Sequence, residues 1–109
     1  MAEILHAQDI VSLGLTLTVY YTVPPATVSA IGVIHVVNTD TVSRSYRLCK
    51  APPSSGATQQ NALAWDFTLA AGDHVEWGRG EYWRAGTTLQ ASASSANVVN
   101  LSFSCVENT

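Results

Sequence analysis

The amino-acid sequence predicts an all-β protein, a single-domain antiparallel β-sandwich that is jelly-roll-like or barrel-like, with about eight strands. Three observations lead to this fold class. Apolar and polar residues alternate along most of the chain, as in strands with one buried face. Turn-forming residues interrupt the alternation every ~8–14 residues, and no segment has a helical apolar stripe. A chain of 109 residues has room for one domain, which we assign to residues 1–109.

The first half of the chain contains three predicted strands. Residues 13–23 carry apolar side chains at the odd positions, and Pro24 ends this long strand. Val28–Asn38 is rich in β-branched residues at nearly consecutive positions, which indicates a central strand covered on both faces. Ser45–Ala51 is the next antiparallel strand. Ahead of these, we expect residues 1–12 to form either an N-terminal arm or an added edge strand.

The second half begins with a polar loop at 52–61, which is long enough to be a functional loop on length alone. Alternating strands are predicted at 63–69, at 75–77 and at 87–95, each introduced by turn chemistry. The last strand, at 99–105, places Val, Leu, Phe and Cys on one side and Asn and Ser on the other.

Charge is sparse, since only 12% of the residues are Asp, Glu, Lys or Arg. Five cations without clustering are too few for a nucleic-acid binder or for a polybasic membrane patch. No apolar run approaches the ~18 residues that span a bilayer, and the first residues do not have the pattern of a secretory signal, so we expect neither a membrane span nor a signal peptide. A small domain with so few charges is poorly protected against self-association, which predicts a subunit that is covered by its neighbours.

Residues that could carry chemistry do not combine into a catalytic motif, so we expect no enzyme, no metal and no cofactor. His74 and Glu76 share one face of a strand, but two ligands are fewer than zinc takes. His35 fits a buried or interface histidine with a satisfied nitrogen. Cys49 and Cys105 are expected to be reduced, small core residues, although a disulfide between them stays open.

Aromatic and arginine side chains concentrate at 77–84. Trp65 and Trp77 are expected in the core. Tyr82, Trp83 and Arg79 are expected to contact a neighbouring subunit, because Trp, Tyr and Arg are the residue types that dominate interface hot spots. A sugar-binding platform is the alternative reading of this cluster. The predicted contact residues between subunits are Arg79, Tyr82, Trp83, Arg84, Ile4 and Leu5.

The order of several short motifs resembles a family of small virion structural proteins of tailed bacteriophages. The resemblance covers residues 20–107, and each motif alone is a weak signal. Trp77 and Cys105 are bulkier or more distinctive than the family pattern leads us to expect. The matching segments are Tyr21-Thr22-Val23-Pro24, Ile34-His35-Val36-Val37-Asn38, Asn61-Ala62-Leu63-Ala64-Trp65-Asp66-Phe67, Leu69-Ala70-Ala71-Gly72-Asp73, Ala85-Gly86-Thr87-Thr88-Leu89-Gln90-Ala91-Ser92-Ala93-Ser94 and Val106-Glu107.

This resemblance implies a subunit present in many copies on a virion, with no catalytic residues. We therefore expect a capsid decoration or cement protein, made in the cytoplasm of a bacterial host. It would form a homo-oligomer, for which a trimer is one arrangement, and bind the major capsid protein or other virion proteins. The alternatives are a tail or fibre-attachment component of the virion and a carbohydrate-binding β-sandwich module.

Overall fold

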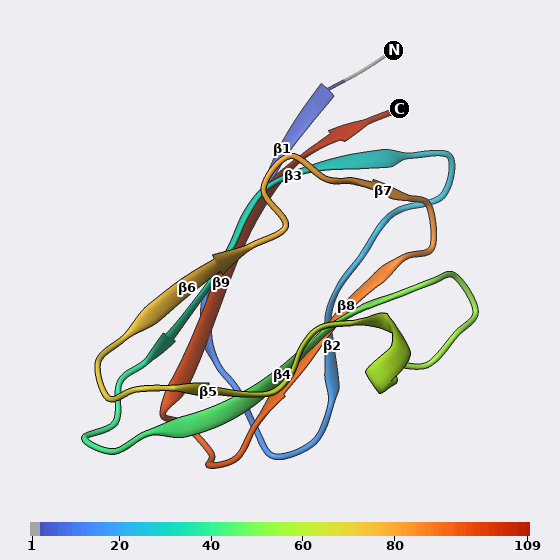
Figure 1. The fold of residues 1–109 in the computed structure, drawn as a ribbon. Helices are drawn as coiled ribbons and strands as arrows, with labels where there is room; N and C mark the ends of the chain where they lie inside the picture. The colour runs from blue at the N-terminus through green and yellow to red at the C-terminus, as the bar shows by residue number, and fades with distance from the viewer. Residues whose placement is uncertain (1–2) are drawn as a thin grey trace.

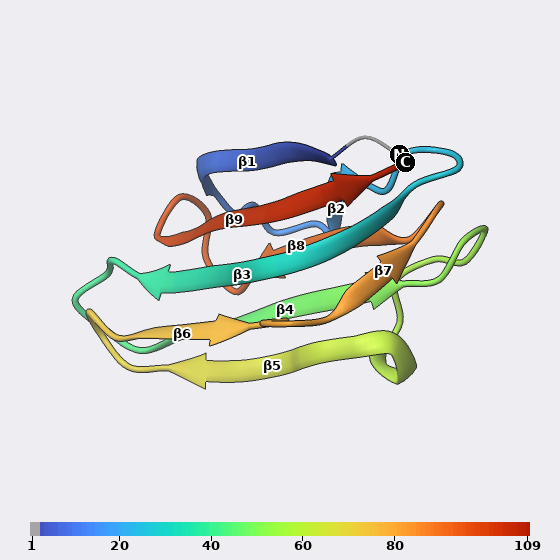
Figure 2. The same ribbon diagram turned by 90° about the horizontal axis from the view of Figure 1, so that it is seen from above.

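A computed structural model of the chain describes residues 3–109, and these residues form two antiparallel β-sheets packed face to face (Figures 1 and 2). The predicted fold class, a single antiparallel β-sandwich, is confirmed. The strands are β1 (Glu3–Ser12), β2 (Thr18–Thr22), β3 (Val28–Asn38), β4 (Arg44–Ala51), β5 (Ala62–Leu69), β6 (His74–Trp77), β7 (Tyr82–Arg84), β8 (Thr88–Ala93) and β9 (Val99–Asn108), with one 3-10 turn, η1 (Gln59–Asn61).

The strand order is that of a jelly roll. Sheet A has the order β1-β9-β3-β6, with β7 also paired to β3, and sheet B has the order β2-β8-β4-β5. When β6 and β7 are counted as one strand position, the chain is a long hairpin with the pairs β1·β9, β2·β8, β3·β6/β7 and β4·β5. Rolling this hairpin adds the pairs β9·β3 and β8·β4, which closes the two sheets of a jelly roll.

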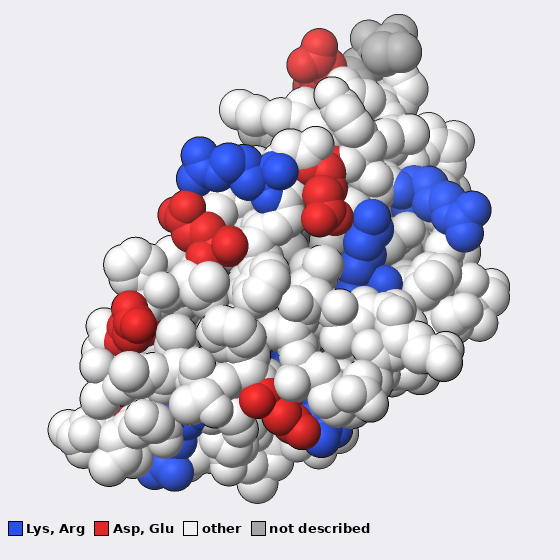
Figure 3. Space-filling view, in the orientation of Figure 1, with Lys and Arg blue, Asp and Glu red and all other residues white. Residues whose placement is uncertain are grey.

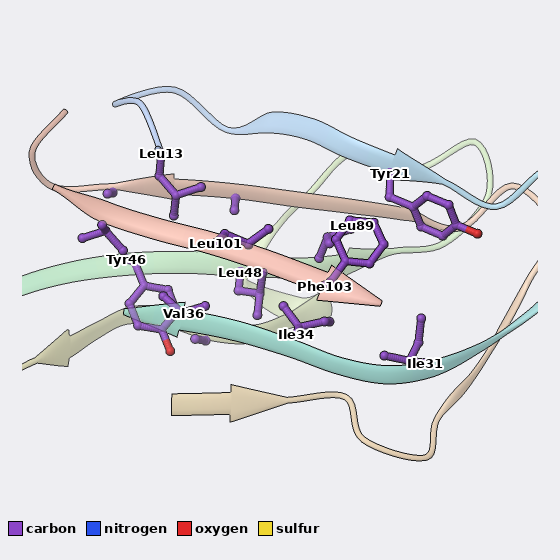
Figure 4. Close-up of a cluster of buried hydrophobic side chains, with 14 of the residues drawn as sticks. Leu13, Tyr21, Ile31, Ile34, Val36, Tyr46, Leu48, Leu89, Leu101 and Phe103 are labelled. Carbon is purple, nitrogen blue, oxygen red and sulfur yellow. The ribbon is translucent and has the colours of Figure 1, made fainter. Parts of the chain in front are cut away.

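The core lies between the two sheets, where side chains from both meet (Figure 4). In β9, the alternation places Leu101, Phe103 and Cys105 inward, and all three are at most 3% exposed. The opposing sheet contributes Leu48 and Leu89, which are fully buried. Burial of a side chain of this size stabilises a fold by ~1.5–3 kcal/mol, so the shared apolar layer is what holds the sheets together.

The bounds of β3 agree with the strand predicted at Val28–Asn38, but its predicted cover on both faces is wrong. Ile34 and Val36 face sheet B and are fully buried, whereas His35 and Val37 on the other side are half-buried. A sandwich of two sheets buries only one side of each, so the outer side of β3 faces away from the core.

The long strand predicted at 13–23 is also wrong in its first part. Leu13 is fully buried, but Leu15 is 68% exposed, so the odd positions do not share one face. The chain crosses here from sheet A to sheet B, and β2 begins only at Thr18. Of the residues predicted as an arm or an added edge strand, 3–12 form β1, which pairs with β9 at the edge of sheet A; Met1 and Ala2 lie outside the described residues. Within residues 3–109, no helix is long and apolar enough to span a membrane.

Candidate functional site

Large apolar side chains are exposed to solvent on the side of sheet A that faces away from sheet B. Leu5 on β1 is 85% exposed and Tyr82 on β7 is 73% exposed. The register aligns them, because Leu5 pairs with Val106 of β9. Val106 in turn pairs with Ala30 of β3, and Ala30 pairs with Tyr82. A row of four apolar residues therefore crosses the whole sheet from one edge to the other.

The next row along the strands carries a charge at each end. Glu3 pairs with Asn108, Asn108 pairs with Val28, and Val28 pairs with Arg84. An acidic side chain thus stands at the β1 edge and a basic one at the β7 edge. We call this surface the outer face, which consists of Glu3, Leu5, Ala7, Val28, Ala30, Gly32, Tyr82, Arg84, Ser104, Val106 and Asn108.

The outer face has an apolar hollow of about 310 Å³ beside Leu5, which we call the Gly32 hollow. Its wall is formed by Ala7, Ser104 and Val106 together with Leu5. Gly32 has no side chain to fill the space, and a Cβ atom there would lie 2.9 Å from the Ser104 Oγ atom. The hollow depends on this glycine, which occupies an irregular position in the pairing of β3 with β9.

Most basic side chains of the molecule have an acidic partner. Figure 3 shows charged side chains scattered over a largely uncharged surface, several of them as pairs of opposite sign. Within residues 3–109, Arg84 is the one Lys or Arg without an ion pair, and Glu3 on the same row also has none. The ion pairs are Arg44–Asp40, Arg47–Asp66, Lys50–Glu81 and Arg79–Glu76.

A second hollow, of about 290 Å³, lies at the β7 edge of the outer face and is lined by two cations. Lys50 and Arg84 contribute the positive charges, and Tyr82 and Thr87 complete the wall with Pro52. We call it the Lys50–Arg84 hollow. Glu81 offsets part of its charge, because a Glu81 oxygen lies 3.4 Å from the Lys50 Nζ atom.

The residues predicted as subunit contacts are brought together only in part. Leu5, Tyr82 and Arg84 lie in two neighbouring rows of the outer face. Ile4 lies on the opposite side of β1, level with Glu107 of β9, and is 52% exposed because β1 is an edge strand. Arg79 lies in the turn between β6 and β7, where its guanidinium donates to the Glu76 carboxylate at 2.8 Å.

The assignment of Trp83 to a surface contact is wrong, because its side chain is fully buried in the core. Tyr82 and Trp83 are consecutive in a strand, so they point to opposite sides of the sheet. The Trp83 indole N–H donates to Glu81 at 3.0 Å, and the Lys50 Nζ atom lies 5.6 Å from the ring centroid. The predicted sugar platform of Arg79, Tyr82 and Trp83 therefore does not form.

The outer side of sheet B carries a group of side chains that the alternation of apolar and polar residues does not reveal. The Arg47 guanidinium lies 3.9 Å from the Trp65 ring centroid and donates two hydrogen bonds to Asp66, at 2.6 and 3.1 Å. Arg47 holds the pKa of the Asp66 carboxyl below its usual range. Trp65 was expected in the core but lies half-buried beneath Arg47, whereas Trp77 does pack against the core. Asp66 has a φ of 52° at an irregularity in the pairing of β5 with β4, which strand alternation does not reveal.

The histidines on sheet A approach one another without forming a metal centre. The rings of His35 and His74 lie 5.3 Å apart, and Glu76 is level with His35 but pairs with Arg79. In the part of the chain that the structure describes, no three side chains of His, Cys, Asp or Glu are placed to hold a metal ion.

Cys49 and Cys105 are both free and buried. Cys105 faces the core from sheet A, whereas Cys49 lies in sheet B beside the loop at 52–61, where its thiol is 3.7 Å from the Thr58 carbonyl oxygen. Burial raises the pKa of both thiols. Neither protein-family models nor curated proteins give a match to this chain.

Proposed function

We propose that the protein is a structural subunit of a bacteriophage virion, a capsid decoration protein that binds the head surface as a homo-oligomer and stabilises it. The observation that carries the proposal is the exposed apolar row Leu5–Val106–Ala30–Tyr82 on the outer face. Contiguous exposed apolar surface on a small domain is typical of a protein–protein contact. Such a subunit acts by contact and needs no catalysis.

Two further observations support this proposal. The chain has few charges and a formal net charge of only −3 at pH 7, so long-range repulsion between copies is weak. The jelly-roll strand order is an architecture that viral capsid domains use, although lectin domains use it too. The fold therefore supports a virion role only by analogy, whereas the exposed apolar row on the outer face supports a protein–protein contact on physical grounds.

The mechanism is mechanical. Each copy contributes modest contacts, and an oligomer that touches several capsid subunits at once gains avidity from the high effective concentration of its remaining contacts. Bridging neighbouring subunits in this way resists the outward pressure of the packaged genome.

Immunogold electron microscopy tests this function. An antibody against the purified chain is applied to particles released from the bacterial culture whose phage encodes it. Gold on the heads is the expected result. Gold on the tails supports the alternative tail or fibre-attachment role. If the chain is found only in the soluble fraction and on no particle, both virion roles are contradicted.

The carbohydrate-binding alternative loses its aromatic platform, because Trp83 is buried in the core. A Trp83→Ala variant would therefore report on stability and cannot test sugar binding. Tyr82→Ala is the variant that separates a surface role from a core role, since Tyr82 is the exposed aromatic of this cluster.

A further inference from the structure

We propose that two copies associate through their outer faces, about a two-fold axis parallel to the strands and above β3. Tyr82 of each copy enters the Gly32 hollow of the other, and Glu3 of each approaches the Lys50–Arg84 hollow of the other. The proposal deepens the homo-oligomer part of the proposed function by naming its interface. It depends on the surface described above and holds whether or not the oligomer binds a capsid.

The position of the axis follows from the strand order. In sheet A, β9 and β7 flank the first residues of β3, and β1 lies one strand beyond β9. A two-fold axis along β3 reverses this strand order in the partner. Each row of one copy then faces the same row of the other copy. Tyr82 of β7 then lies over the partner's β9, which forms a wall of the Gly32 hollow. β1 then lies beyond the partner's β7, where the Lys50–Arg84 hollow opens.

Shape favours this arrangement over the other alignments of the two faces. Tyr82 is a large, exposed side chain at one edge, and the hollow lies on the same face on the other side of β3. Ala30 lies on the axis and meets the partner's Ala30, so small side chains allow the two sheets to approach closely. An axis midway between β9 and β3 would instead set Leu5 over the partner's Tyr82. These two large side chains would hold the sheets apart and leave the space above the small side chains of β9 and β3 empty.

Charge points to a second copy as the occupant. Glu3 and Arg84 lie in the same row, and neither has an ion pair within residues 3–109. The two-fold axis brings each Glu3 to the level of the partner's Arg84, and the second such contact follows by symmetry. A self-complementary surface of this kind has opposite charges at its two ends, as this row does.

The available area fits a weak, reversible interface. The outer face spans four strands spaced ~4.8 Å apart, and it extends along about five residues of β1, β9 and β3 and along the three residues of β7, which gives on the order of 300 Å² of sheet. A standard interface buries ~800 Å² per partner, counted as accessible surface. The side chains that project from the face, such as Leu5 and Tyr82, add to the flat area, but the outer face stays below the standard size, so we expect association only at high concentration.

Sedimentation equilibrium of the full chain across a concentration series tests the proposal. The expected result is a reversible species of twice the 11.6 kDa monomer mass. Tyr82→Ala is expected to weaken the association by about 30-fold, as for an interface hot spot. Leu15→Ala is the matched control, because Leu15 is similarly exposed but lies outside the outer face. Equal effects of the two variants would overturn the proposal.

A charge exchange tests the orientation of the two copies. Arg84→Glu and Glu3→Arg each place like charges opposite one another, so each is expected to weaken association by about tenfold. The double variant restores the pairs and is expected to regain most of the affinity. Two single effects that add in the double variant would contradict the proposed axis.

The two proposals fail separately. A chain that stays monomeric at every concentration overturns the interface between copies. If the monomeric protein is still found on phage heads by immunogold labelling, and the Tyr82→Ala substitution abolishes this labelling, the outer face binds another virion protein. Dimers that label no particle leave the interface in place and contradict the virion function.

Discussion

At the scale of single residues, a buried hydroxyl links the two sheets at one end of the core. The Tyr21 hydroxyl, from β2 of sheet B, donates to the Glu107 carboxylate of sheet A at 2.6 Å and also contacts the Ser29 hydroxyl. Glu107 is only 8% exposed. Burial and the Glu107 hydrogen bond raise the pKa of Tyr21 far above its ordinary value, so this phenol stays protonated and remains a donor.

Tyr21→Phe is expected to lower the free energy of unfolding by ~1–3 kcal/mol, because it leaves the buried Glu107 carboxylate without this donor. Urea denaturation measures the change. Tyr20→Phe on the same strand is the control, since Tyr20 packs against the core and its hydroxyl has no hydrogen-bond partner among residues 3–109. Its effect should stay within about 0.5 kcal/mol of the parent. Equal stability of the two variants would show that the Tyr21 hydroxyl does not stabilise the fold.

The residue scale is also where the sequence is least informative. Alternation assigned the inward residues of β9, such as Leu101 and Phe103, because a long regular strand repeats its signal. Trp83 has no such signal, since β7 has three residues and its partner β3 lies far away in the chain. The aromatic and arginine residues at 77–84 suggested a contact surface. Only the pairing of β7 with β3 shows which side chains of this segment point into the core.

At the scale of elements, the turn between β6 and β7 requires a glycine for two reasons. Gly78 has a φ of 75°, a left-handed conformation that disfavours other residues. A Cβ atom at this position would lie 3.1 Å from the Ile34 Cδ1 atom and 3.2 Å from the Ile31 Cγ2 atom. The turn is therefore pressed against β3, which holds β6 and β7 on the same strand.

Gly78→Ala is expected to destabilise the fold more than Gly72→Ala. Gly72 has a similar φ of 73°, but a Cβ atom there meets open space. Both variants carry the left-handed strain of ~1–2 kcal/mol, and Gly78→Ala adds an overpacking cost of ~1–3 kcal/mol. Thermal denaturation of the two variants gives the comparison. Equal melting temperatures would show that the turn can move away from β3.

The outer face shows which features of a sheet can be predicted from the sequence and which cannot. The bounds of β3 were predicted from its β-branched residues, and the strand is central, as expected. The row that joins Leu5 to Tyr82 could not be predicted, because it depends on the register of four strands from distant parts of the chain. β1 is an integral strand of sheet A and not a separate arm, so deleting residues 3–12 would expose an edge of β9.

At the scale of the whole molecule, the two thiols lie at sites of different depth. Cys105 lies in the central core, whereas Cys49 lies on the other side of sheet B, beside the loop at 52–61. Burial raises the pKa of both, which lowers the fraction of reactive thiolate. Access to Cys49 requires only that the loop open, but access to Cys105 requires the sheets to separate.

The single-thiol variants Cys49→Ser and Cys105→Ser distinguish these openings. In Cys105→Ser, the remaining Cys49 is expected to react with Ellman's reagent at a rate that depends weakly on urea. In Cys49→Ser, the remaining Cys105 should react slowly, with a steep urea dependence that matches global unfolding. The same steep dependence for both thiols would mean that the loop opens only when the whole sandwich unfolds.

The rolled hairpin has a consequence for synthesis. Because β9 inserts between β1 and β3, a strand that is synthesised after both of them completes the middle of sheet A (Figure 2). Until residues 99–108 emerge, β1 has no neighbour and one edge of β3 stays unpaired. Pairing of such distant segments is slow, and an unpaired edge can accept a strand from another nascent chain. When many copies are translated from one message, the late pairing of β9 decides whether each chain closes on itself or exchanges that strand with a neighbour.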